Sequence, residues 1–248
     1  MALSGESEAA GAAAGFDWRP LAVSLQVAIP ATIASVAVGT GLGWLLARKC
    51  GPAARRWLGA AVLLPLALPP TVLGWYLLVV IGRRGPVGRL WEQVTGEPLV
   101  FTRSAAVVAA MVGGIPVVAR QMAAAFSAQD PHLLEAARLD GAGPWSAARL
   151  VELPLARGAL VAAGAVAFAR ALGDFGATLM VAGNLPGRTQ TAALAVYEYS
   201  GAGRDADAAR MVAATTAAAA LLLAGLAWFD EPAPPPAGTP YREVGKDR

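Results

Sequence analysis

The sequence has little of the side-chain chemistry on which most enzymes and metal centres depend. Its 248 residues include one cysteine, Cys50, and one histidine, His132. An internal disulfide and a Cys/His metal cluster are therefore excluded. Charged residues are also scarce, at 15% of the chain, whereas an average soluble domain has about 25%.

Lysine is nearly absent too, with Lys49 and Lys246 as the two copies. Neither lies in a G-x-x-x-x-G-K-[ST] motif, so the chain lacks this phosphate-binding loop. No nucleophile–base pair stands out, and we expect neither a catalytic residue nor a cofactor in this chain. The net charge of +3 does not indicate nucleic-acid binding, because the basic residues are scattered and no dense basic run is interleaved with aromatic residues.

Long apolar blocks are what the sequence does have. Hydrophobic residues make up 56% of the chain, and the mean hydropathy is +0.51. A membrane-spanning helix needs about 20 mostly apolar residues. Five stretches qualify, at about 21–47, 57–81, 104–126, 158–182 and 211–229. The sequence therefore predicts an all-α integral membrane protein whose permease domain covers residues 21–229 and has five transmembrane helices.

Charge in the tails and loops predicts the orientation. Residues 1–20 are slightly acidic, unlike a secretory signal, so we expect a retained external N-terminal tail. The loop 48–56 carries four basic residues, which favours the cytoplasmic side. Five spans then place the C-terminus inside the cell. The tail 230–248 contains five prolines, and we expect it to be disordered.

The predicted cytoplasmic loop, residues 127–157, differs from the rest of the chain. Asp130 and Pro131 are typical of a helix start, and Gly141 is typical of a helix end. A second short helix can start at Pro144 and stop at Leu153-Pro154. We expect Leu133, Leu134 and Ala137 to share one face of the first helix. Such an amphipathic knob suits docking into a groove of another protein.

The spacing within this loop resembles a known motif. Glu135-Ala136-Ala137 is followed by Gly141, then by nine residues, and then by Val151, Glu152 and Leu153-Pro154. This pattern is similar to the EAA loop of ABC importer permeases, with Val151 in place of the usual isoleucine. The resemblance implies coupling helices that sit in a cleft of an ATPase subunit, with these residues in that role: Glu135, Ala136, Ala137, Gly141, Leu153 and Pro154. The alternative is an amphipathic loop that packs only on its own bundle.

Residues 64–88 and 168–191, followed by Val196-Tyr197, resemble the molybdate branch of these permeases, to which sulfate permeases are related. The resemblance implies the type I ABC importer permease fold in the cell membrane. It also implies a homodimer with two copies of an ATPase, which bind ATP and Mg, and an extracytoplasmic molybdate-binding protein. Tungstate or sulfate/thiosulfate are alternative substrates. A secondary transporter, a channel or a membrane scaffold would not need the docking loop.

Two predicted spans carry residues that suit a translocation pathway and gate. The second span contains Pro65, Pro69 and Pro70, which break helical hydrogen bonding. The fourth contains Arg170 and Asp174, whose i,i+4 spacing allows an ion pair, as well as Gly173 and Gly176, which allow another backbone to come close. The alternatives are a packing kink and a structural salt bridge that only fixes helix orientation.

Three arginines lie in the predicted outer loops, namely Arg83, Arg84 and Arg188. They could attract an oxyanion on its way into the membrane. We favour a second interpretation, in which they dock the acidic lobes of a binding protein.

Overall fold

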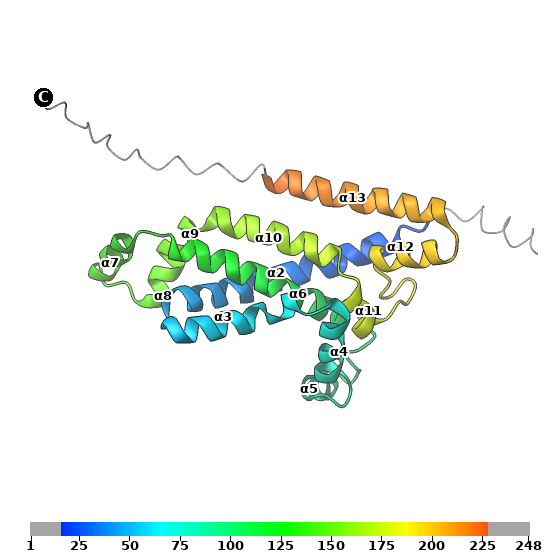
Figure 1. Cartoon of the computed structure of the whole chain (residues 1–248), viewed down its shortest axis with the longest axis horizontal. Helices are drawn as coiled ribbons and strands as arrows, with labels where there is room; N and C mark the ends of the chain where they lie inside the picture. Colours follow the sequence, from blue (N-terminus) through cyan, green and yellow to red (C-terminus); the bar gives the residue numbers. More distant parts are fainter. Residues whose placement is uncertain (1–15, 228–248) are drawn as a thin grey trace, which may run out of the picture.

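The computed structural model describes residues 16–227, and every regular element within that range is a helix (Figure 1). Most of the predicted external tail 1–20 and the whole tail 230–248 lie outside the described residues. The helices are α2 (Arg19–Arg48), α3 (Pro52–Ala67), α4 (Pro70–Ile81), α5 (Pro86–Thr95), α6 (Arg103–Ser127), α7 (Pro131–Leu139), α8 (Pro144–Ala147), the π-helical turn η1 (Ala148–Glu152), α9 (Leu153–Leu155), α10 (Arg157–Leu172), α11 (Gly176–Ala182), α12 (Ala192–Gly201) and α13 (Asp205–Ala227).

Three of the described helices are long and apolar enough to cross a membrane, and they are α2, α6 and α13. Two further candidates are bent pairs. Helices α3 and α4 meet at 109°, and the segment Pro144–Leu155 meets α10 at 76°. By length and composition, the described part of the chain thus holds three candidate spans, or up to five if each bent pair counts as one.

The predicted continuous spans at 57–81 and 158–182 are broken in the structure. The first breaks at Leu68 and Pro69, both of which adopt extended ψ angles, before Pro70 begins α4. Pro70 fits that first helical position because its missing N–H is not needed there. The second breaks between Leu172 and Gly176, so that α10 and α11 are separate helices. Helices α5 and α12 were not predicted, because they are too short for a membrane-span pattern.

Helices α2 and α6 pack closely along the centre of the bundle. A Cβ atom placed on Gly39 would lie 2.6 Å from the Cβ of Val118, and one on Gly43 would lie 2.8 Å from that of Met122. Ser35, one turn earlier, donates from Oγ to the carbonyl of Met111 at 3.0 Å. The small residues at every fourth position of α2 therefore let the two backbones approach, as in many membrane helix pairs.

The remaining helices give the molecule two different ends (Figure 1). Helices α7 and α8 project from one end of the bundle, whereas α11 and α12 lie toward the other. Helices α4 and α5 stand across the long axis near α11, and α13 follows one flank. Helix α3 has no buried residue. The candidate sites lie at these two ends, and they are joined by the long helices α2, α6 and α10.

Candidate functional site

The first candidate site is the projecting loop 127–157, which we call the coupling loop. Its first helix, α7, begins as predicted, because the Asp130 carboxylate accepts a hydrogen bond from the backbone N–H of His132 at 2.9 Å. It ends at Leu139, and Gly141 follows two residues later with a φ of +86°, in the left-handed region that glycine adopts most readily. The predicted second helix start at Pro144 is also confirmed.

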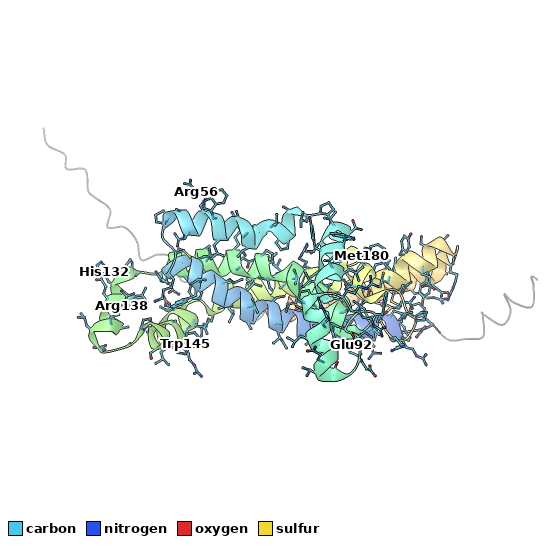
Figure 2. All side chains as sticks on the ribbon, turned by 90° about the horizontal axis from the view of Figure 1, so that it is seen from below. Arg56, Glu92, His132, Arg138, Trp145 and Met180 are labelled. Carbon is cyan, nitrogen blue, oxygen red and sulfur yellow. The ribbon has the colours of Figure 1, made fainter. Side chains whose placement is uncertain are left out.

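The outer surface of the coupling loop carries both apolar and charged side chains. His132, Arg138 and Trp145 point away from the bundle at this end of the molecule (Figure 2). Glu135 is also exposed, and its Oε2 lies 3.6 Å from Nδ1 of His132. The exposed apolar side chains of the loop are Leu133, Leu139, Trp145, Leu150 and Leu155. Such a surface has the composition of a docking site rather than of a water-facing loop.

Leu133, Leu134 and Ala137 all lie in α7, at positions that span about 100° of the helix surface, as the predicted shared face requires. Leu134 is buried and Ala137 half-buried, whereas Leu133 is exposed. The bundle therefore covers only the part of this face that holds Leu134 and Ala137, and Leu133 stays accessible. In the EAA segment, Glu135 and Ala136 are exposed.

The far end of the coupling loop bends sharply into α10. Leu153 is half-buried and packs against Phe126 and Ala156, while Pro154 is exposed. The helical segment that starts at Pro144 runs through Leu153-Pro154 to Leu155, one residue beyond the predicted stop, and the 76° bend follows directly at Ala156.

One feature of this end was missed by sequence reasoning. The carboxylate of Glu152 is buried and bound by Trp44 and Arg48 of α2. The available signals were weak: an acidic residue between Val151 and Leu153, and a tryptophan and arginine four positions apart at the end of an apolar span.

The second candidate site lies where α4 packs on α11. A Cβ on Gly176 would lie 2.9 Å from the Cβ of Pro70, and one on Gly74 would lie 2.7 Å from that of Met180. The structure therefore brings together Pro70 and Gly176, which the sequence placed in different predicted spans. Pro65 lies one helix away, half-buried within α3, and Gly173 lies at the end of α10.

The expected ion pair between Arg170 and Asp174 is absent from the ion pairs of residues 16–227. Arg170 instead donates from Nε to the carbonyl of Gly113 in α6 at 2.8 Å. Asp174 accepts from both the backbone N–H and the hydroxyl of Thr178, at the start of α11. Because α10 ends at Leu172, the i,i+4 geometry on which the pairing depended does not exist here.

Two separate cavities are lined by the three arginines of the predicted outer loops. Arg188 shares a cavity of about 290 Å³ with Thr102, Arg103 and Thr189. Arg103, which was not singled out from the sequence, fixes this loop by donating to the carbonyls of Gly187 and Arg188 at 3.0 and 2.7 Å.

The second hollow, of about 510 Å³, is lined in part by Arg83 and Arg84. Arg83 is 65% exposed and lies 3.9 Å from Glu92, a weak surface pair. Within residues 16–227, no group of three or more His, Cys, Asp or Glu side chains could hold a metal ion.

Known proteins share this sequence and this fold. The family described as binding-protein-dependent transport system inner membrane component matches residues 39–230. The molybdenum transport system permease protein ModB of Azotobacter vinelandii is 38% identical over 183 residues, which are 74% of this chain and 80% of that protein. ModB of Escherichia coli K12 is 36% identical over 214 residues, 86% of this chain and 93% of that protein.

Among solved structures, an inward-facing form of the methionine ABC transporter MetNI resembles the chain with a TM-score of 0.67. The match covers 86% of this chain and 93% of that one, at 20% identity. At this identity the likeness shows the fold alone.

Proposed function

This chain belongs to the family of binding-protein-dependent transport system inner membrane components, and on that premise we propose that it is the permease of a molybdate importer. The chain is a membrane subunit of an ATP-driven importer, and hydrolysis of ATP belongs to a separate subunit. Molybdate is the proposed cargo because the ModB proteins of two bacteria are 36–38% identical to this chain.

The coupling loop is the single observation that carries the mechanism. It combines a capped helix, a left-handed Gly141 corner and exposed side chains that include Glu135, Leu139 and Trp145. This is the shape and chemistry of a helix that inserts into a groove on a partner. We propose that Glu135, Ala136, Ala137, Gly141, Leu153 and Pro154 form the loop that docks into an ATPase subunit.

The proposed assembly has two copies of this chain, two ATPase subunits and an extracytoplasmic molybdate-binding protein. The end with α7 and α8 would face the cytoplasm and the start of α2 would lie outside. The basic residues Arg48, Lys49, Arg55 and Arg56 support this orientation, because all four lie at or near the α2–α3 corner, at the same end as the coupling loop (Figure 2 labels Arg56).

The proposed route for the oxyanion runs past the α4–α11 contact. Helix breaks at membrane depth are tolerated where backbone lines a cavity or packs on protein. Pro69, Pro70, Gly173 and Gly176 lie at two such breaks. In a single copy of the chain, the Arg170 side chain is exposed. An exposed charge within a span requires water or a second copy of the chain beside it. We therefore place the pathway between two copies of the chain.

Uptake of labelled molybdate tests this function. We expect high-affinity uptake to disappear in cells that lack the gene and to return with the parental chain. In parental cells, unlabelled tungstate should compete, whereas sulfate should not. If molybdate uptake persists in the deletion strain and sulfate uptake falls, the cargo is sulfate. If no oxyanion uptake changes, the proposed function is wrong.

A further inference from the structure

Glu152 is a buried carboxylate that joins the coupling loop to a spanning helix. Its side chain is 3% exposed. Arg48 donates from Nε to Oε1 at 2.5 Å, and Trp44 donates from Nε1 to Oε2 at 2.6 Å. Both donors lie on the last turns of α2, more than 100 residues earlier in the chain. Each carboxylate oxygen therefore holds its own donor, and the two donors come from one helix.

The same residues also connect to the end of α6. Arg48 donates from a terminal nitrogen to the carbonyl of Phe126 at 2.7 Å and to Oε1 of Gln129 at 3.4 Å. Gln129 in turn donates to the backbone carbonyl of Glu152 at 2.7 Å. The hydrogen bonds thus form a closed circuit through α2, the end of α6 and the turn η1. We call Trp44, Arg48, Gln129 and Glu152 the Glu152 joint.

Apolar packing alone would already hold the coupling loop against the bundle. Met122, Phe126, Ala156 and the half-buried Leu153 form one apolar cluster at this place. Hydrophobic contact is non-directional, so it permits small rotations of the loop. The Glu152 joint adds directional bonds, and breaking a buried charge pair is costly because the remaining charge lacks a partner. The joint therefore resists rotation of the loop in a way that the apolar cluster does not.

We propose that the Glu152 joint makes the coupling loop and the inner ends of α2 and α6 move as one unit. This inference rests on the proposed function. A force applied to the exposed helix α7 would pass through η1 to Glu152, and from there to Arg48 and Trp44. Helix α2 runs the length of the bundle and packs tightly on α6, so it carries the displacement toward the outer end. These four residues are positioning residues, since none of them has to touch ATP or the cargo.

The first test is Glu152→Gln in the complete complex of permease, ATPase and binding protein, reconstituted in vesicles. Glutamine keeps the volume but removes the charge and replaces one acceptor oxygen by an NH2 group, so one of the two donors, from Trp44 or from Arg48, faces another donor. We expect the variant complex to assemble and to hydrolyse ATP, while the molybdate transported per ATP falls about tenfold, a size typical of residues that link two sites. Glu97→Gln, an exposed carboxylate on the outer side, is the matched control.

The double variant Arg48→Met/Glu152→Met separates a transmission role from a purely stabilising one. Replacing a buried ion pair by apolar residues of similar volume often preserves or raises stability. We expect the double variant to have the parental melting temperature. Its transport of molybdate per ATP should be as low as that of Glu152→Gln, because the directional bonds are gone.

The inference is overturned if the double variant matches the parent both in melting temperature and in molybdate transported per ATP, because the ion pair then only stabilises the fold. It is also overturned if Glu152→Gln transports as well per ATP as the parent. A parental chain that recruits no ATPase would overturn the proposed function as well, and it would be detected before any variant is compared.

Discussion

The two ends of this molecule are held together by different kinds of contact. At the coupling-loop end, side chains from three segments bind one another around the buried Glu152. At the end that carries the α4–α11 contact, glycines let helices approach, and Arg170 reaches a backbone carbonyl rather than a partner side chain. The contact around Glu152 depends on directional side-chain bonds, whereas the α4–α11 contact depends mainly on the absence of side chains at Gly74 and Gly176.

This difference fits two tasks of an ATP-driven importer, which are coupling to the ATPase and gating of the pathway. A coupling element must transmit a displacement without slipping, and a network of hydrogen bonds with fixed geometry does so. A gate must let helices change their contact, and small residues allow packed helices to slide by short distances. The coupling loop and the proposed pathway should therefore respond differently to substitution.

Gly74→Ala gives the largest expected effect at the outer end. The new methyl group would lie 2.7 Å from the Cβ of Met180 and 3.0 Å from the Cα of Ala177, so the α4–α11 contact must open. We expect a loss of about 1–3 kcal/mol in stability, even though alanine favours the helix. Thermal unfolding in detergent measures the stability, and labelled molybdate uptake measures the consequence for transport.

The matched control is Gly59→Ala in α3, where nothing lies within 4 Å of an added Cβ. This variant should be neutral or more stable by up to about 1 kcal/mol, because alanine is the better helix former. Equal stability changes in the two variants would show that close approach at Gly74 is not what holds α4 to α11.

Gly141→Ala gives the next largest effect, at the coupling loop. Its φ of +86° costs an alanine about 1–2 kcal/mol, although an added Cβ meets no neighbouring atom. The strained corner shifts α7, and we expect about a tenfold weaker affinity for the ATPase subunit. Titration of purified ATPase against the permease measures this.

Gly143 lies two residues later with a φ of −65° and equally open space around it. Gly143→Ala should therefore bind the ATPase like the parent. If both variants lose affinity equally, the added methyl groups themselves disturb the docking surface, and the backbone conformation of Gly141 is not the cause.

A smaller effect is expected where the proposed binding protein docks. Exposed charge pairs contribute about 0.2–1 kcal/mol each, so the double variant Arg83→Gln/Arg84→Gln should weaken stimulation of the ATPase by the binding protein several-fold. The basal ATPase rate should not change. The loss should shrink at high salt, since screening already weakens the parental contact. Arg89→Gln, an exposed arginine of α5, is the control, and an equal loss there would show a general charge effect rather than a docking site.

Much of the coupling loop could be predicted from the sequence because its signals are local. The Asp130 cap and the Gly141 corner act within a few residues of chain. The Glu152 joint could not be predicted, because it depends on residues more than 100 positions apart. No local pattern says which arginine reaches a given carboxylate.

The apolar blocks predicted the spanning segments but not where they break. The span pattern is a property of composition, and it continues across Leu68-Pro69 and across residues 173–175. The proline pair predicted a disturbance at the first break without its 109° angle. At the second break, the polar side chain of Asp174 binds Thr178 and starts a new helix, which the i,i+4 interpretation of Arg170 and Asp174 did not consider.

The smallest expected effect follows from that second break. A continuous helix would pair Arg170 with Asp174, whereas the structure gives them separate partners, Gly113 and Thr178. In a double-mutant cycle of Arg170→Met and Asp174→Asn, we expect an interaction energy below about 0.5 kcal/mol, the range found for independent sites. Thermal unfolding of the four proteins measures it. An interaction energy well above about 1 kcal/mol would mean that the two charges do pair. The fourth span would then be a continuous helix in the membrane, and the outer end would depend on a side-chain bond, as the coupling-loop end does.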